Sequence, residues 1–388
     1  MVPPTQYARA AADLPALGRL IAALESRGYQ VLGPVLRDGA ILYDSVKNLE
    51  DLPADWIDEQ EPARYRVTQA NHGALFGYTV GPQSWKKFLY PPALRLFQIE
   101  RHDGGVRVVE NNGSPPRFAF LGVRACELAA IAAQDRALTA GPYADPVYQR
   151  RRAGLFVVAV NCTRAAATCF CASLHTGPRA AGGFDLALTE LADNGEHLFV
   201  VDAASSEGRE VLREIGASPA SDELCRRADE AVARAAAQIR SVDTTGLHEV
   251  LAEAFDHPRW EQTAGRCLAC GNCTMVCPTC FCTSVEDASD IGGTRAERWR
   301  RWDSCFTQAF SYIHGGSVRQ SVKSRYRQWL SHKLAWWIDQ FGGSGCVGCG
   351  RCITWCPAGI DLTEEVRALR ERAPASASHS QENDDGDT

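Results

Sequence analysis

The chain has 388 residues, of which 45% are hydrophobic and 23% charged, proportions typical of a soluble globular protein with two or three domains. Its formal net charge of −6 argues against nucleic acid as a partner, and its longest strongly apolar run, residues 155–160, is far shorter than the roughly 20 residues of a membrane span. Asp13 and Arg19 interrupt the N-terminal apolar residues, so we expect no signal peptide and a cytoplasmic location without membrane contact.

Residues 1–255 are expected to form an α/β domain. Leu17, Leu20 and Leu24 recur at helical spacing before Gly28, a residue suited to end a helix. Asp38–Gly39 between two apolar stretches predicts a hairpin. In chain order, the expected elements are a helix over 14–27, paired strands over 29–34 and 40–46, a strand over 117–121, a helix over 125–138, strands over 155–160 and 198–201, and helical segments over 221–255.

Sixteen cysteines in a chain without an export signal indicate metal binding rather than disulfides, because cytoplasmic thiols stay reduced. Eight of them form two quartets with the spacing C-x2-C-x2-C-x3-C-P. The quartets are Cys267, Cys270, Cys273 and Cys277, and Cys346, Cys349, Cys352 and Cys356. A [4Fe–4S] cluster needs one thiolate per iron, and three cysteines at this spacing can bind three corners from one tight loop.

The fourth cysteine of each quartet is expected to bind the cluster of the other quartet, as in two-cluster ferredoxins. One cluster would then be held by Cys267, Cys270, Cys273 and Cys356, and the other by Cys346, Cys349, Cys352 and Cys277. Zinc is the alternative, but zinc ribbons use two C-x2-C pairs and give a third cysteine at this spacing no role. The spacing therefore predicts two [4Fe–4S] clusters.

Residues 256–372 are expected to form a mainly α-helical, ferredoxin-like domain around these clusters. Residues 373–388, which hold no large apolar residue, are expected to be a disordered tail. Residues 278–345 separate the quartets and are interpreted as a long helical insert with a helix over 319–340. The insert suits either a cover with a solvated basic face or a docking surface for a partner subunit. Its aromatic and basic residues include Trp299, Trp302, Trp329, Trp336, Trp337, Arg295, Arg298, Arg300, Arg301, Arg325 and Arg327.

Four cysteines of the N-terminal domain, Cys126, Cys162, Cys169 and Cys171, form a looser set that can hold a third cluster. Cys126 and Cys162 each follow an expected strand, and free amides at a helix start favour a thiolate at Cys126. The alternative is a set of buried structural thiols, because cysteine packs well as a small hydrophobe. The remaining cysteines are a weaker trio without a fourth member, and one interpreted as structural. They are Cys280, Cys282 and Cys305, and Cys225.

Motifs for a nucleotide site or a hydrolytic centre are not recognisable in the sequence: we find no GxGxxG after a strand, no P-loop and no HExxH. We therefore predict no catalytic residue in this chain. Its expected activity is the transfer of electrons between redox partners.

The chain resembles a known family, the iron–sulfur beta subunits of cytoplasmic NAD(P)-linked [NiFe] hydrogenases (sulfhydrogenases), to which the A subunit of anaerobic sulfite reductase is closely similar. The resemblance covers nearly the whole chain except its tail, and the segments outside the quartets make it specific. In the N-terminal part these segments are Gly81–Pro82 with Lys86, Pro91–Pro92, residues 122–127 (GVRACE), Asn161–Cys162, residues 168–171 (TCFC) and residues 183–186 (GFDL). In the C-terminal part they are residues 267–282, ending in CPTCFC, residues 302–305 (WDSC) and residues 346–352 (CVGCGRC).

This resemblance implies a non-catalytic subunit of an oxidoreductase complex that relays electrons between two kinds of partner. One partner would be a flavin- and NAD(P)-binding subunit carrying the FAD and NAD(P). The other would be the small and large subunits of a [NiFe] hydrogenase. A subunit of anaerobic sulfite reductase is one alternative, and a scaffold protein with purely structural clusters is another. We prefer the hydrogenase.

Overall fold

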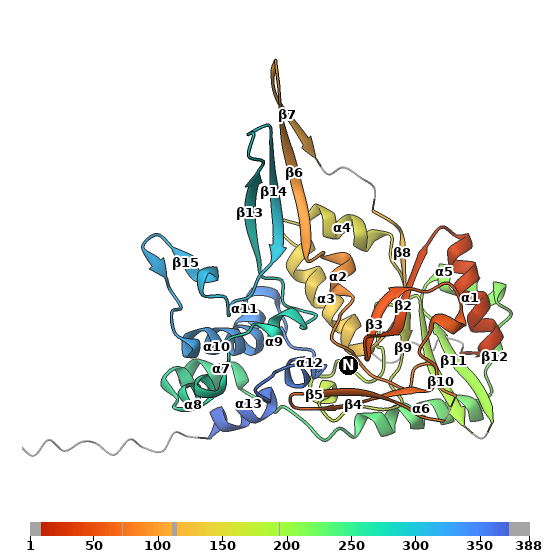
Figure 1. Cartoon of the computed structure of the whole chain (residues 1–388). Coiled ribbons are helices and arrows are strands. Elements are labelled where there is room, and N and C mark those ends of the chain that lie inside the picture. The colour runs from red at the N-terminus through yellow and green to blue at the C-terminus, as the bar shows by residue number, and fades with distance from the viewer. Residues whose placement is uncertain (1–8, 72, 111–114, 194, 372–388) are drawn as a thin grey trace, which may run out of the picture.

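The structure is a computed structural model that describes residues 9–71, 73–110, 115–193 and 195–371 (Figure 1). The expected tail at residues 373–388 lies outside the described residues. The N-terminal part is built on an eight-stranded sheet of order β12-β1-β11-β10-β9-β8-β2-β3. Its strands are β1 (Ala10–Asp13), β2 (Gln30–Arg37), β3 (Ala40–Ser45), β8 (Phe118–Val123), β9 (Phe156–Val160), β10 (Leu186–Asp193), β11 (Glu196–Ala203) and β12 (Ser218–Pro219).

The centre of this sheet is parallel, with β2, β8, β9 and β10 paired in that order, whereas the outer pairs are antiparallel. Parallel strands need a cover on both faces, and β8 shows this directly because all six of its residues are buried. Ala119 and Leu121 belong to one apolar core, and Phe118 and Phe120 to a second. The predicted α/β class of the N-terminal part is confirmed.

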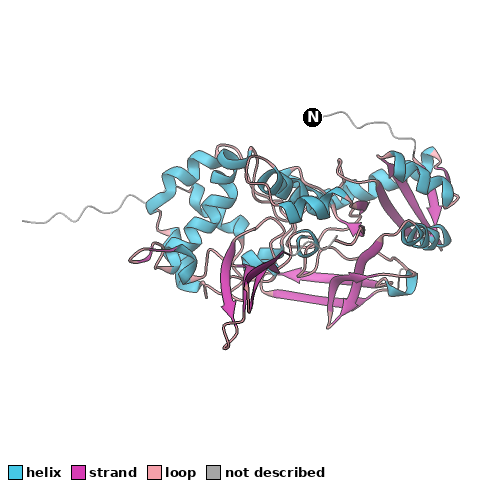
Figure 2. Cartoon of the chain, turned by 90° about the horizontal axis from the view of Figure 1, so that it is seen from above, coloured by secondary structure: helices cyan, strands magenta, loops and turns pink. Residues whose placement is uncertain are grey.

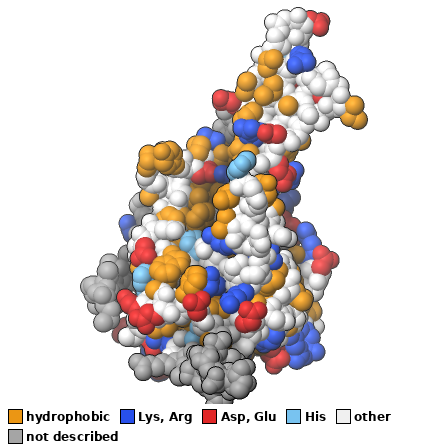
Figure 3. All heavy atoms as spheres, turned by 90° about the vertical axis from the view of Figure 1, so that its left-hand side faces the viewer, with side chains coloured by type: hydrophobic (Ala, Val, Ile, Leu, Met, Phe, Trp, Pro, Cys, Tyr) orange, Lys and Arg blue, Asp and Glu red, His pale blue; other side chains and the backbone are white. Residues whose placement is uncertain are grey.

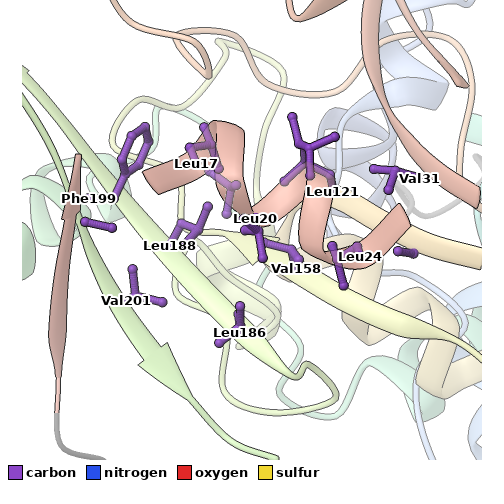
Figure 4. Packing of buried hydrophobic residues seen from close by; sticks show 14 of the residues in the cluster. Leu17, Leu20, Leu24, Val31, Leu121, Val158, Leu186, Leu188, Phe199 and Val201 are labelled. Atoms are coloured by element: carbon purple, nitrogen blue, oxygen red, sulfur yellow. The ribbon is translucent and has the colours of Figure 1, made fainter. Parts of the chain in front are cut away.

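One face of the sheet is covered by α1 (Leu14–Ser26) and α5 (Ser206–Glu214). Asp13 caps α1 by accepting a hydrogen bond from the backbone N–H of Ala16. Leu17 then lies near the sheet residues Leu188 and Phe199, and Leu20 lies beside Val158 (Figure 4). The helix predicted over 14–27 and the hairpin predicted at residues 38–39 are both present.

The opposite face carries the helices that lie nearest the cysteines. They are α2 (Lys86–Leu89), α3 (Ala125–Thr139) and α4 (Pro146–Ala153), and α6 (Asp222–Ala236) packs further along, against β10 and β11. Cys225 on α6 packs beside a small apolar core that contains Leu191 and Val200, which agrees with its interpretation as a structural thiol. A hairpin of β4 (Trp56–Glu61) and β5 (Arg64–Gln69) completes this part.

The C-terminal part is not mainly helical, so that part of the fold prediction is wrong. The insert at residues 278–345 begins with two long strands, β13 (Thr283–Ser289) and β14 (Arg295–Trp302), and contains a short pair, β15 (Tyr312–Ile313) and β16 (Gly316–Ser317). Strand β14 pairs with β6 (Ala93–His102), which pairs with β7 (Gly105–Glu110). The resulting four-stranded sheet projects from the molecule as an arm (Figure 1).

Several arginines of the insert's strands pair with acids of the arm and its base. Arg298 binds Asp287 across β13 and β14, and Arg301 binds Glu286 in the same way. Arg300 forms an ion pair with Asp145 at the start of α4. Basic and acidic side chains accordingly lie beside one another on the face that carries the arm (Figure 3). The insert therefore does not present a continuous basic surface on its strands.

Helices gather at the end of the molecule opposite the eight-stranded sheet (Figure 2). They are α7 (Leu247–Glu253), α8 (Arg259–Arg266), α9 (Asn272–Met275), α10 (Val322–Ser331), α11 (Trp337–Phe341), α12 (Arg351–Thr354) and α13 (Leu362–Arg370). A π-helical turn, His332–Trp336, joins α10 to α11, so the long helix predicted over 319–340 is present as one continuous run. Trp260, Tyr326 and Trp329 fill the core between these helices. Among the described residues, no helix is long and apolar enough to cross a membrane.

Candidate metal centres

The first quartet lies on a tight loop between α8 and α9. Cys267 ends α8, and Ala269 and Gly271 turn the chain through positive φ angles of 50° and 76°. The turn brings Cys273 onto α9 and leaves Cys270 exposed. The backbone N–H of Ala269 donates to the Sγ of Cys267 at 3.4 Å, an amide–sulfur contact of the kind that tunes metal-bound thiolates.

A pocket holds the thiols of the first quartet together with cysteines of the second. It is lined by Cys267, Cys270, Cys273, Cys352 and Cys356, and otherwise mainly by apolar and aromatic side chains, among them Phe306, Tyr326 and Trp329. Burial raises the pKa of Cys273 well above its usual value, and the neighbouring Cys267, Cys356 and Cys270 raise it further. Deprotonated thiols crowded in an apolar pocket require a compensating cation, which iron supplies. The residues of this pocket therefore fit a cluster with the expected crossed ligand, Cys356.

The second quartet lies on a similar loop before α12. Gly348 and Gly350 adopt positive φ angles of 62° and 78°, and Cys346 and Cys349 are buried. Burial raises the pKa of Cys352 well above its usual value, and the nearby Cys346, Cys349 and Cys277 raise it further. Cys277 of the first quartet thus lies beside the thiols of the second, as the crossed arrangement requires.

The looser N-terminal set also comes together in space. Strands β8 and β9 are parallel neighbours, so Cys126 after β8 and Cys162 after β9 lie at the same edge of the sheet. Burial raises the pKa of Cys169 well above its usual value, and the neighbouring Cys171 and Cys162 add to the shift. Cys171 acts in the same way on Cys126. The four thiols that the sequence grouped are therefore neighbours.

The expectation that the helix start favours a thiolate at Cys126 is wrong for the free thiol in this structure. Cys126 does open α3, but burial raises its pKa well above the usual value, and the adjacent Cys171 and Cys349 raise it further. Loss of water around the sulfur outweighs the contribution of the helix start. A thiolate at this position would need a bound cation.

The N-terminal set and the second quartet are in direct contact. The backbone N–H of Phe170 donates to the carbonyl of Gly348 at 2.9 Å, and the hydroxyl of Thr176 donates to the carbonyl of Val347 at 2.7 Å. Cys126, Cys171 and Cys349 belong to one buried cluster. The three cysteine sets therefore lie in series, with the second quartet between the N-terminal set and the first quartet.

Replacing Gly348 by alanine is expected to destabilise this contact strongly. A Cβ at Gly348 would lie 2.6 Å from the Cα and the backbone nitrogen of Cys171, and the φ angle of 62° disfavours any side chain. Overpacking and left-handed backbone together cost about 2–4 kcal/mol. Thermal unfolding and iron content of the anaerobic protein measure the effect. The matched control is Gly265→Ala on α8, where a Cβ meets nothing within 4 Å; equal behaviour of the two variants would contradict the prediction.

The weaker trio does not form a set of its own. A hydrogen bond from the Cys280 thiol lowers the pKa of Cys277 well below its usual value, and Cys305 acts in the same way on Cys282. Cys280 therefore lies beside Cys277 as a thiol donor to its sulfur. Cys282 and Cys305 form a separate pair nearby.

Two buried lysines beside these thiols were missed as functional residues by sequence reasoning. The Nζ of Lys86 donates to the carbonyls of Cys277 and Cys280, and burial lowers its pKa to about 8. Lys333 lies in the helical run at residues 322–341, with its Nζ beside the Sγ of Cys277. A signal for Lys333 was present, because Leu330, Lys333, Leu334 and Trp337 share one face at helical spacing.

Comparison with known proteins agrees with this geometry. Residues 266–360 match a family described as a 4Fe-4S dicluster domain. Over 346 residues the chain is 32% identical to sulfhydrogenase 2 subunit beta of Pyrococcus furiosus, covering 88% of this chain and 92% of that protein. No solved structure matches the chain at a significant level.

Proposed function

The chain belongs to the family of sulfhydrogenase beta subunits, and from this premise we propose that it is an iron–sulfur electron-transfer subunit of a hydrogenase complex. The observation that carries the proposal is that Cys356 lines the pocket of the first quartet and Cys277 lies near thiols of the second, which supports an exchange of the fourth ligands between the two quartets. That exchange is the arrangement of two-cluster ferredoxins, whose role is to pass electrons.

Three sets of cysteines are proposed as ligands. Each would hold a [4Fe–4S] cluster, which when bound accepts and returns one electron at a time. The first set is Cys267, Cys270, Cys273 and Cys356, the second is Cys346, Cys349, Cys352 and Cys277, and the third is Cys126, Cys162, Cys169 and Cys171. The third set is supported by the proximity of its four thiols and by its contact with the second.

The protein around these sets would exclude water from most of the series and leave the first set, at one end, exposed to solvent. Phe306, Tyr326 and Trp329 cover the first set from inside, while Cys270 reaches the surface. The surface loop that carries Cys270 is therefore the proposed point of exchange with a partner subunit. The proposed partners are a flavin- and NAD(P)-binding subunit, which would carry FAD and NAD(P), and the small and large [NiFe] hydrogenase subunits. The cytoplasm remains the proposed location, on the reduced-thiol argument from the sequence.

Iron and acid-labile sulfide per chain, measured on anaerobically purified protein, test the ligand sets. Three clusters predict about twelve of each, and Cys169→Ala should lower both to about eight. EPR after dithionite reduction should lose one signal in that variant. If the unaltered protein holds about eight and Cys169→Ala changes nothing, the third set is structural. Zinc in place of iron would overturn the whole proposal.

Analysis of the purified complex distinguishes the proposed hydrogenase from the two alternatives. A hydrogenase predicts co-purified nickel, whereas a sulfite reductase predicts the absorbance of sirohaem. A redox titration separates both from a scaffold, because structural clusters would stay silent across the physiological range.

A further inference from the structure

Lys333 is a buried cation with an unusual set of neighbours. Its side chain lies on the inner face of the helical run at residues 322–341, and the residue is only 3% exposed. Its Nζ lies 3.2 Å from the Sγ of Cys277 and 3.5 Å from the Sγ of Cys280. The hydroxyl of Thr279 and the carbonyl of Gly345 accept from the same Nζ, at 3.1 and 3.2 Å.

These neighbours leave the charge of Lys333 facing sulfur. Burying an ammonium group is unfavourable unless an anion and several acceptors accompany it. The groups that the structure places in hydrogen-bond range of Nζ are two sulfurs, a hydroxyl and a carbonyl, and the sulfur of Cys277 is the one that becomes anionic as a cluster ligand. The position of this lysine is therefore best explained by the metal-bound form of the protein.

Lys86 and Arg351, two other buried cations near these thiols, are arranged differently. Lys86 donates to backbone carbonyls, at 2.9 Å from Cys277 and 2.8 Å from Cys280, and lies over the ring of Trp302, so it holds the turn around the cysteines. Arg351 lies near Cys349, but its charge is matched by Glu127 at 2.7 Å. Lys333 therefore combines direct contact with a ligand sulfur and a charge that no carboxylate within the described contacts matches.

A positive charge and an N–H···S hydrogen bond at a cluster ligand favour the reduced state, because reduction adds one negative charge to the cluster. We propose that Lys333 is a positioning residue that raises the reduction potential of the cluster held by Cys277, Cys346, Cys349 and Cys352. This inference rests on the proposed function, since it requires a redox-active cluster at the second set. Its consequence is that the cluster at the second set, in the middle of the series, would be reduced more easily than it would be with its four thiolates alone.

EPR-monitored redox titration of the full chain, purified with its clusters, tests the proposal through the Lys333→Met variant. The relevant signal is the one absent from a Cys346→Ala sample. At the midpoint of the unaltered protein, Lys333→Met should show at least a tenfold lower ratio of reduced to oxidised cluster, equivalent to about 59 mV for a one-electron couple. Lys333→Arg, which keeps the charge, should stay close to the unaltered protein. Lys323→Met is the matched control, because Lys323 lies on the same helical run and pairs with Glu261 at the surface; its potentials should not change.

Iron content separates failure of this proposal from failure of the proposed function. If the unaltered protein lacks iron at the second set, the proposed function fails. If Lys333→Met keeps its iron and its potential, or if Lys333→Arg shifts the potential as far as Lys333→Met, the role of the charge is overturned. If Lys333→Met loses iron, the deciding variant is Lys333→Gln, because glutamine keeps a hydrogen-bond donor without the charge. A reduction potential lowered as predicted for Lys333→Met would support the proposal. An unchanged reduction potential, or loss of the cluster, would overturn it.

Discussion

With three clusters bound as proposed, replacing Cys346 by alanine is expected to lower iron from about twelve to about eight atoms per chain and to stop electron flow between the two proposed partners. The second set lies between the other two, in contact with the N-terminal set through Gly348 and with the first quartet through Cys352 and Cys277. Removing the middle site leaves a gap in the series. The measurement is NAD(P)H-driven hydrogen production by the purified complex, which should fall to background.

Cys225→Ala is the matched control for this experiment. It removes a thiol that packs beside the apolar core of α6, and it should change neither iron content nor activity. Hydrogen production that survives in Cys346→Ala despite the loss of iron would show that electrons bypass the second set, and the serial arrangement would then have no functional meaning.

Replacing Glu127 by alanine is expected to reduce the free energy of unfolding by about 3–5 kcal/mol, the range for breaking a buried ion pair from one side. Glu127 is 1% exposed, and its partner Arg351, 2.7 Å away, is fully buried. The carboxylate also accepts from the hydroxyl of Tyr43 and the indole of Trp85. Alanine would leave a buried guanidinium and two buried donors without this acceptor. Denaturant unfolding of the anaerobic full chain measures the effect.

Further variants distinguish charge from shape at this ion pair, which joins α3 to the second quartet. Glu127→Gln keeps an acceptor and should lose less stability than Glu127→Ala. A double variant, Glu127→Met with Arg351→Met, removes both charges and should be more stable than Glu127→Met alone. Glu230→Ala, at an exposed pair with Arg226, should change nothing measurable. If the double variant is the least stable of the series, the packing of Arg351 rather than the pairing of charges holds the joint together.

The sequence predicted helices and strands of residues 1–255 because the spacing of apolar residues along the chain reflects which side chains are buried. The alternation of apolar strands and helices in residues 1–255 reflects burial on both faces of the sheet, and strand β8 is buried throughout. Cys126, Cys162, Cys169 and Cys171, which the sequence groups as a candidate third set, are neighbours in the structure for a related reason. Loops after neighbouring parallel strands meet at one edge, so the topology brings their thiols together.

The insert shows why the rest was not accessible from sequence. Residues 283–302 are rich in charge and lack regular apolar alternation, because β13 is mostly exposed and β14 has no fully buried residue. Their strand conformation depends on pairing between β14 and β6, which joins Arg295 to Glu100, nearly two hundred positions apart in the chain. Such long-range pairing overrides local propensity. The turn at residues 290–293 was the one local sign of a hairpin.

The contacts of Lys86 and Lys333 with the cysteine loops, and the raised pKa of Cys126, could not be predicted from the sequence because they depend on which side chains are buried together. Helical spacing placed Lys333 on an apolar face, but the sulfur that it contacts belongs to a separate loop. For Cys126 the argument from the helix start ignored the loss of water around the thiol. The boundary predicted near residue 255 stays a prediction, although β6 and β14 pair across it.

The packing of Phe170 and Cys171 against Gly348 has a consequence for the order in which the proposed clusters would be inserted. Iron and sulfide, or a preformed cluster, cannot reach Cys126, Cys169 or Cys349 once these thiols are sealed inside the folded chain. We therefore expect cofactor loading to precede final closure of the segment around residue 170 on the second quartet. The site at Cys270 opens to solvent and can be filled or repaired afterwards. A subunit that closes too early would remain permanently deficient at its inner sites while its outer site matures normally.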